Sequence, residues 1–129
     1  MPGRVESYRD LDAWKLSMAA VSAVYRLTGR FPSDERFGLT AQLRRAAVSI
    51  PSNIAEGWGR QTTPEYARFL RVARGSLYEV ETQLLIAIEL GLAEAGETRA
   101  TLEEVEHAGR VLAGLVRSIE RKLDRDPDR

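Results

Sequence analysis

The chain has 129 residues, 43% of them hydrophobic, which suits a single compact domain with its own core. Its 19 basic and 19 acidic side chains cancel, which argues against a protein whose main task is to coat nucleic acid or an acidic membrane. Cysteine is absent, so disulfides, thiolate nucleophiles and cysteine-bound metals are excluded.

The N-terminal residues 1–9 are polar and lack the apolar run of a signal peptide. No later segment has the roughly 20 apolar residues that a membrane-spanning helix needs. We therefore expect a cytoplasmic protein without a membrane partner.

A first helix is predicted over about residues 11–28. Apolar residues recur there at steps of three and four, which places them on one helical stripe. Asp10 is positioned to cap the first turn, and Gly29 to end the helix in a left-handed conformation. The stripe is wide, which indicates contact with more than one neighbour.

The second predicted helix follows a corner at Phe31-Pro32-Ser33, with Ser33 as its N-cap. Its apolar stripe continues to Asn53 and Gly57 and includes Pro51 in mid-helix. A proline there costs roughly 3 kcal/mol in an ordinary helix interior. Pro51 falls next to the stripe and is expected to face away from it, so we predict a kink rather than a break.

After a short connection around Trp58, Thr62 and Pro64 mark the start of a third helix. Its apolar residues keep strict four–three spacing up to Gly91, which is predicted to end it. A fourth helix is predicted to begin between residues 97 and 102, with Thr101 and Glu104 as a capping box, and to run to about residue 123.

Four helices joined by short turns predict an all-α, up-down-up-down antiparallel four-helix bundle. We expect one domain over residues 1–129, with a structured core of about 10–123 and tails at 1–9 and 124–129. The first and fourth helices have apolar stripes broader than a bundle core needs. That excess predicts burial against another copy of the chain.

Charge is distributed unevenly along the chain. Residues 36–74 hold seven arginines against Glu56 and Glu65, a net charge of +5, whereas residues 75–129 hold seven bases and twelve acids, a net charge of −5. By heptad position, six arginines fall on outer or flanking faces of the second and third helices or at the turn between them. They are Arg44, Arg45, Arg60, Arg68, Arg71 and Arg74.

The runs FGLTAQLRRAAVSIPSNIAEGWGR and EYARFLRVARGSLYEVETQLLIA, preceded by DLDAWKLSMAAVSAVYRLT, are similar to the four-helix-bundle family of 23S rRNA intervening-sequence proteins. The similarity covers nearly the whole domain. It implies an all-helical protein that assembles as a homopentameric ring and has no enzymatic activity. Relatives that serve diversity-generating retroelements bind nucleic acid and a reverse transcriptase through a basic surface, from which this neutral chain departs.

Two interpretations of the arginines remain open. They form a phosphate-binding strip for RNA, or they pair with the acidic second half of a neighbouring subunit, as the two different surfaces of a ring interface allow.

Other polar and aromatic residues have a structural and a functional interpretation. Trp58 either covers the end of the core or stacks on a base. Asn53 and Glu56 are expected to satisfy backbone groups near Pro51 or to pair with an arginine rather than to form a polar site. Gly75 and Ser76 are expected to permit close helix approach.

His107 lies among glutamates but lacks the second histidine of a metal motif, and no catalytic constellation stands out. We predict no enzyme activity, no metal, no cofactor and no small-molecule substrate. The function hypothesis is a homo-oligomeric scaffold or adaptor, with RNA or a nucleic-acid-bound protein as a further partner. The alternative is a purely structural homo-oligomer without a nucleic-acid partner.

Overall fold

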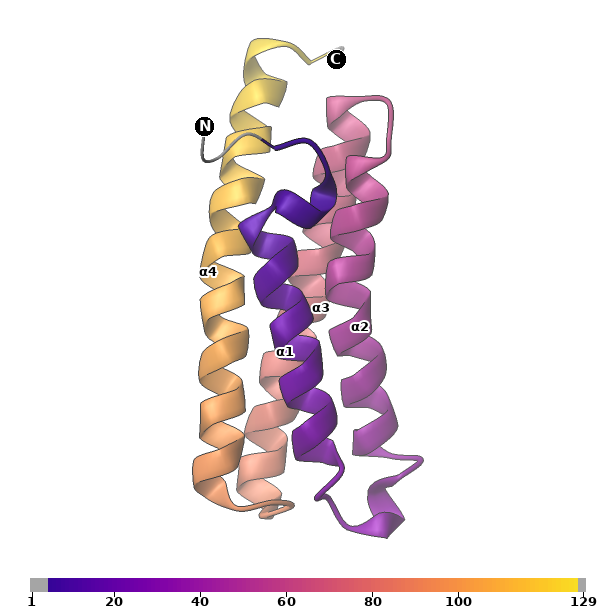
Figure 1. The fold of residues 1–129 in the computed structure, drawn as a ribbon, viewed down its shortest axis with the longest axis vertical. Helices are drawn as coiled ribbons and strands as arrows, with labels where there is room; N and C mark the ends of the chain where they lie inside the picture. The colour runs from indigo at the N-terminus through magenta and orange to yellow at the C-terminus, as the bar shows by residue number, and fades with distance from the viewer. Residues whose placement is uncertain (1–4, 128–129) are drawn as a thin grey trace.

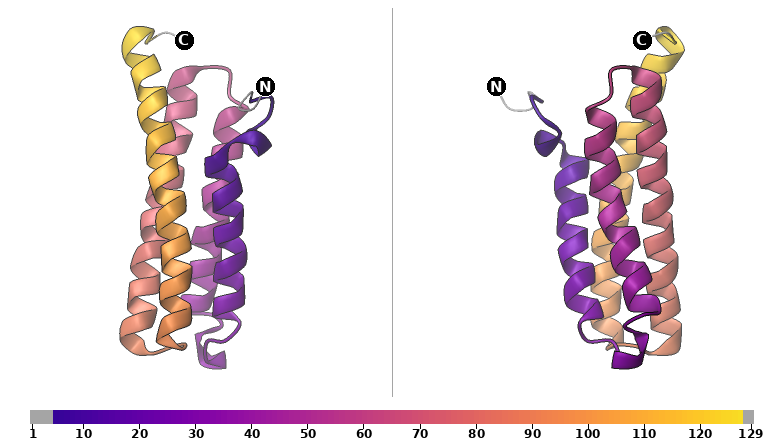
Figure 2. Two further views of the ribbon diagram at one scale, coloured as in Figure 1. Left: turned by 60° about the vertical axis from the view of Figure 1, so that its left-hand side comes forward. Right: turned by 90° about the vertical axis from the view of Figure 1, so that its right-hand side faces the viewer.

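The computed structural model describes residues 5–127, which form four long antiparallel helices (Figures 1 and 2). They are α1 (Asp12–Thr28), α2 (Leu39–Trp58), α3 (Thr63–Leu90) and α4 (Ala95–Arg125), with 3-10 turns η1 (Tyr8–Asp10) and η2 (Ser33–Glu35). The described part of the chain contains no strand. The predicted all-α class and the four-helix architecture are confirmed.

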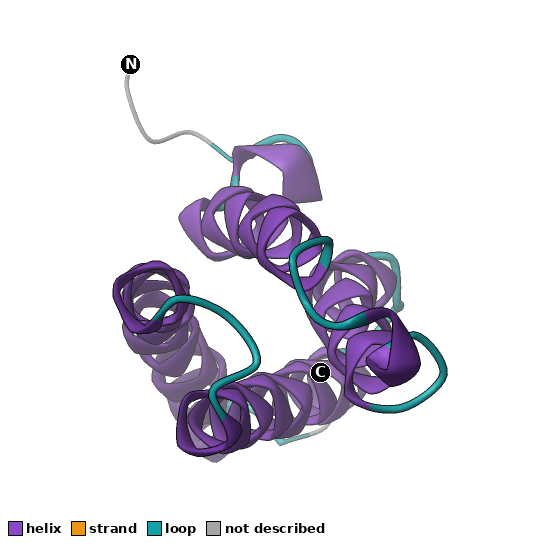
Figure 3. Ribbon diagram, turned by 90° about the horizontal axis from the view of Figure 1, so that it is seen from below, coloured by secondary structure: helices purple, strands orange, loops and turns teal. Residues whose placement is uncertain are grey.

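Each helix packs against the two neighbours that precede and follow it around the bundle, and α4 closes the circle against α1 (Figure 3). The core lies along the common axis of the four helices. Its largest fully buried side chains come from every helix: Val24, Leu43, Ile50, Ile54, Leu70, Leu77, Val80, Leu84, Val105, Leu112 and Val116. Those of α3 and α4 occupy the stripes that the three–four spacing predicts, whereas Val24 and Ile54 lie beside the stripes predicted for α1 and α2.

The start and end of α1 differ from the prediction. Asp10 does not cap α1; its carboxylate accepts hydrogen bonds from the backbone N–H groups of Glu6 and Ser7, which closes η1. Gly29 stays right-handed, with φ of −61°, because the next N–H groups continue to bond three residues back, from Arg30 to Leu27 and from Phe31 to Thr28.

The start of α2 was also predicted incorrectly. Ser33 begins the short turn η2, and α2 begins later, at Leu39 after Gly38. The carboxylate of Glu35 accepts the N–H of Leu39 at 3.1 Å. A glutamate from the preceding turn thus supplies the acceptor that the prediction assigned to Ser33.

Pro51 lies inside an unbroken α2, as predicted, and the kink at this residue stays a prediction. Pro51 was expected to face away from the apolar stripe, and the structure buries it beside Trp14 and Met18 of α1. α2 packs against both α1 and α3, so its buried arc is wider than one heptad stripe.

α3 has the ends that its sequence predicts. The Thr62 hydroxyl accepts the N–H of Glu65, proline occupies the first turn, and Gly91 ends the helix with a left-handed φ of 64°. The left-handed conformation satisfies the last carbonyls at little steric cost only for glycine.

α4 begins earlier than predicted. The Glu94 side chain accepts the N–H of Gly96 at 3.1 Å, so the helix starts at Ala95. Thr101 is therefore not a cap; it is buried within the helix and donates to the carbonyl of Glu97.

The two predicted tails are only partly described. In the described part, the chain forms η1 before α1, and α4 extends to Arg125. Residues 1–4 and 128–129 of these tails lie outside the described residues.

Both ends of the described chain lie at the same end of the bundle as the α2–α3 connection (Figure 1). The α1–α2 and α3–α4 connections lie together at the opposite end. None of the helices formed by residues 5–127 is long and apolar enough to cross a membrane.

Candidate interaction surfaces

The end of the bundle at the α2–α3 connection is held by a close backbone approach. A Cβ atom on Gly57 would lie 2.7 Å from the Cβ of Phe69 and 3.1 Å from the Tyr66 ring, so only glycine fits there. Trp58 is half-buried and meets Tyr66 edge to face, with 6.2 Å between ring centroids. Trp58 thus contributes to the cover over this end of the core, with part of its ring left accessible.

The Tyr66 hydroxyl lies under this cover and has no hydrogen-bond partner within residues 5–127. Burial raises the pKa of Tyr66 to about 12, because the phenolate would lose its hydration. The hydroxyl is therefore neutral at physiological pH and unsuited to act as a base.

Arg60 and Arg68 lie together over the ring of Phe69, each with its guanidinium carbon 4.6 Å from the ring centroid. Each also has a local acidic neighbour. Arg60 lies 3.9 Å from Glu56, and Arg68 bonds to Glu65 at 3.1 Å. Glu56 thus lies beside an arginine, at the long end of ion-pair distance.

The other four candidate arginines lie elsewhere. Arg71 bonds to Glu120 of α4 at 2.9 Å. Arg44 donates to the Thr28 hydroxyl at 2.8 Å and stacks on the Tyr25 ring of α1. Arg45 is exposed and Arg74 half-buried, and neither has an ion pair with another described residue. Of the six candidates, the structure brings only Arg60 and Arg68 onto one ring.

Asn53 takes part in a polar contact between α2 and α3. Its amide donates to the carbonyl and the hydroxyl of Ser49 at 2.8 and 2.9 Å, and Ser49 shares a hydrogen bond of 2.8 Å with Ser76. Ser76 thus serves close helix contact. Gly75 does not serve it within the subunit, because a Cβ atom there would meet nothing within 4 Å.

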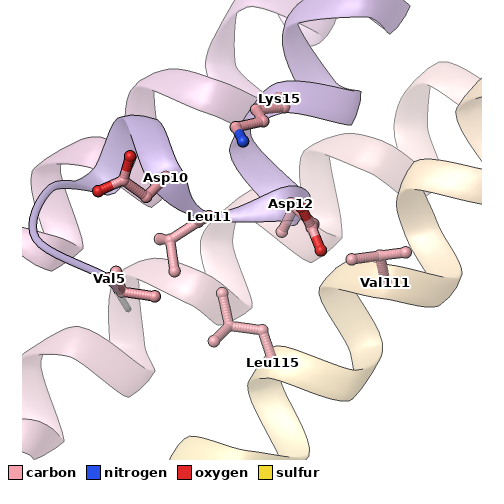
Figure 4. Close-up of a pocket in the computed structure, with 8 residues that line it drawn as sticks. Val5, Asp10, Leu11, Asp12, Lys15, Val111 and Leu115 are labelled. Atoms are coloured by element: carbon pink, nitrogen blue, oxygen red, sulfur yellow. The ribbon is translucent and has the colours of Figure 1, made fainter. Parts of the chain in front are cut away.

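A pocket of about 560 Å³ lies between the start of α1 and α4 (Figure 4). Its floor is formed by Leu11, Val111 and Leu115, and the carboxylates of Asp10 and Asp12 lie on opposite sides of Leu11. Since the two carboxylates do not converge, they form neither an acid–base pair nor a joint metal site.

His107 is exposed on α4. Among residues 5–127, no three histidine, cysteine or acidic side chains are grouped so that they could hold a metal ion.

Half of the exposed large apolar side chains in the described chain lie on α3, and none lies on α4. The expectation of excess apolar surface is thus confirmed for α1, which exposes Met18 and Tyr25, and wrong for α4. Val111 and Leu115 of α4 are half-buried against the core instead. We define the α3 outer face as Val72, Gly75, Tyr78, Leu85, Ile86 and Leu90, all exposed.

A second apolar surface is a groove of about 350 Å³ between α1 and α2, which we call the α1–α2 groove. Trp14, Met18 and Val21 line it from α1, Val48 and Pro51 from α2, and Tyr8 closes one end by an edge-to-face contact with Trp14. The helical spacing alone does not predict the α3 outer face. Its signal in the sequence is the run Leu84-Leu85-Ile86, because a helix with one buried stripe does not need three consecutive apolar residues.

The family model of the 23S rRNA-intervening sequence proteins matches residues 9–114. The chain therefore belongs to this family.

A solved structure with a similar fold is that of a protein of unknown function from the S23 ribosomal protein family of Bacteroides thetaiotaomicron. It is 17% identical, with a TM-score of 0.75 over 81% of this chain and 95% of that chain. No curated protein matches the chain.

Proposed function

We propose that this protein is a non-enzymatic, cytoplasmic scaffold that acts as a ring of identical subunits, a pentamer by its resemblance to the family. The observation that carries the proposal is the α3 outer face together with the α1–α2 groove. Large apolar side chains exposed together on one face mark protein contacts, because water does not stabilise their surface.

The energetic argument concerns the side chains that are half exposed in the single subunit. Tyr78, Leu85 and Leu90 are 56%, 53% and 61% exposed. Since full burial of a large apolar side chain contributes about 1.5–3 kcal/mol, each of them would contribute roughly 1 kcal/mol on assembly. Several such contacts, repeated at every interface of a closed ring, offset the loss of translational and rotational freedom.

Light scattering coupled to size-exclusion chromatography of the full chain tests the proposal. We expect a single oligomer whose mass does not change over a hundredfold dilution at micromolar concentrations. A monomer at all concentrations would refute the scaffold hypothesis.

The second candidate function is contact with RNA at the α2–α3 end of the bundle. Arg60 and Arg68 present two guanidinium groups there, and the partly accessible Trp58 ring lies two residues from Arg60. Arginine and an accessible aromatic ring are the side chains that hold phosphates and unstacked bases. In a ring, this pair of arginines would recur once per subunit.

Binding of a labelled single-stranded RNA measured at 50 and 200 mM salt tests this second function. Phosphate contacts predict steep weakening with salt, and loss of binding when Arg60 and Arg68 are changed to glutamine. The variant Arg45→Gln is the control, because Arg45 is exposed in the first half of α2, away from the α2–α3 connection. Absence of RNA binding in the wild-type protein would leave the purely structural oligomer.

A further inference from the structure

We propose that the α1–α2 groove of one subunit binds the α3 outer face of a second copy of this chain. The inference rests on the proposed homo-oligomer and assigns the two surfaces that meet in it. Three observations carry it: the apolar character of both surfaces, their opposite charges, and an unexplained glycine.

The helix segments that contribute the two surfaces have net charges of opposite sign. α1 carries Lys15 and Arg26 and no acid between Ala13 and Thr28, and α2 carries Arg44 and Arg45 and no acid between Leu39 and Ala55. From Gly75 to Leu90, α3 carries Glu79, Glu81 and Glu89 and no base, and Arg71 and Arg74 flank Val72 at the start of the face.

This pattern disfavours an interface that pairs a surface with itself. Two α3 outer faces in contact would bring together two acidic segments, and two grooves would bring together two basic ones. Pairing the groove with the α3 outer face instead places acids against bases. Such a contact uses two different patches on each subunit, and repetition of it generates a closed ring or an open chain.

Gly75 lies near the middle of α3, where glycine is less favourable than alanine. Packing within the subunit gives no reason for it, since a Cβ atom would meet nothing within 4 Å. Tyr78, Thr82 and Ile86 follow at helical spacing on the same side. A glycine in that row allows another backbone or a large side chain to approach α3 closely, and the rim of the α1–α2 groove supplies such side chains in Met18 and Val48.

Two variants test the assignment. Met18→Asp places a charge in the groove, and Ile86→Asp places one on the α3 outer face. Both residues are partly exposed, at 43% and 40%. We expect each variant alone to remain helical by circular dichroism and to be monomeric by light scattering.

Mixing the two variants gives the decisive measurement. The Met18→Asp subunit retains an intact α3 outer face and the Ile86→Asp subunit an intact groove, so one good interface forms between them. We expect a 1:1 dimer that does not grow further, because its two remaining surfaces are both damaged. Phe37→Asp is the matched control, since Phe37 is 86% exposed in the connection before α2 and lies on neither surface; this variant should assemble as the wild type does.

A reversal of surface charge repeats the test without altering apolar residues. We expect Glu79→Lys/Glu89→Lys alone to weaken assembly at least tenfold, as should Arg26→Glu/Arg44→Glu. The four changes combined in one chain should restore it.

Assembly of the single-surface variants as large as wild type, or a mixture that stays monomeric, would overturn the surface assignment and leave the scaffold proposal standing. A monomeric wild-type protein would overturn both.

Discussion

α3 and α4 are the two longest helices, with 28 and 31 residues, and their inner faces are alike while their outer faces differ. Both bury a continuous stripe in the same core, with Leu77 and Leu84 on α3 and Leu112 and Val116 on α4. Outside, α3 exposes Tyr78, Leu85, Ile86 and Leu90, whereas α4 exposes glutamates, arginines and His107.

The inner stripes of both helices therefore build the core of the bundle. The outer faces differ: the charged face of α4 suits solvent, whereas the apolar face of α3 is available to a partner. A helix that only covers the core has no use for Leu85 and Ile86 next to the buried Leu84. The chemistry of the outer faces, rather than the strength of the stripe, separates α3 from α4.

The prediction with the largest expected change in stability tests whether the inner faces of α3 and α4 are equivalent. Leu77→Ala and Leu112→Ala each remove a fully buried side chain, and each should lower the free energy of unfolding by about 2–5 kcal/mol. Urea denaturation at fixed protein concentration measures both. A loss much smaller for one helix than for the other would show that the two inner faces are not equivalent.

The next prediction compares the outer faces of α3 and α4 by replacing one glycine on each helix with alanine. In the Ile86→Asp background, Gly75→Ala and Gly114→Ala should each raise the free energy of unfolding by about 0.5–1 kcal/mol, because both sites are helical and have room for a methyl group.

In the otherwise wild-type chain, only Gly75→Ala should weaken assembly, measured by dilution in light scattering. Equal weakening by Gly114→Ala would remove the distinction between the outer faces of α3 and α4.

A smaller effect concerns the ion pair that joins the two helices. Arg71→Ala should cost about 0.5 kcal/mol of stability, because both partners of the 2.9 Å pair with Glu120 are substantially exposed and hydrated. A double-mutant cycle with Glu120→Ala measures the coupling by thermal denaturation. Arg117→Ala, on the exposed side of α4, is the control and should have no effect.

The smallest effect concerns Glu81 of α3, which faces Glu106 of α4. Burial, and to a lesser degree the charge of Glu106, raises the pKa of Glu81. The folded protein thus binds this proton more tightly than the unfolded chain does, and the free energy of unfolding should fall as the pH rises from the ordinary carboxyl pKa through the raised one.

Glu81→Gln should therefore be slightly more stable than the wild type at neutral pH and no more stable in acid, where Glu81 is protonated in both states. Thermal denaturation between pH 3 and 8 measures this difference. An advantage of the variant that persists unchanged in acid would contradict the assigned cause.

The sequence predicts the bundle well because its stripes and several of its helix ends depend on local rules. Thr62 and Gly91 satisfy backbone groups within one turn of their own helix, so their roles follow from spacing alone. The starts of α2 and α4 were missed because glutamates, Glu35 and Glu94, supply the acceptors instead of the short polar side chains usual at this position.

The candidate surfaces were harder to predict because they depend on which helices are neighbours. Spacing placed Arg71 on an outer face of its helix, but Glu120, its partner, lies 49 residues further along the chain. Pro51 was expected to face away from the stripe of α2 and is nevertheless buried, because a stripe describes one neighbour and α2 has two. The α3 outer face does have a signal in the sequence, the three consecutive apolar residues Leu84, Leu85 and Ile86.

An even number of antiparallel helices returns the chain to the end of the bundle where it began, beside the α2–α3 connection (Figure 1). A domain fused to either terminus would therefore emerge on the same side and leave the α1–α2 and α3–α4 connections uncovered. If subunits stand side by side with their axes parallel, every attached domain would lie on the same rim of the ring. Each subunit could then carry one such domain without obstructing the opposite rim.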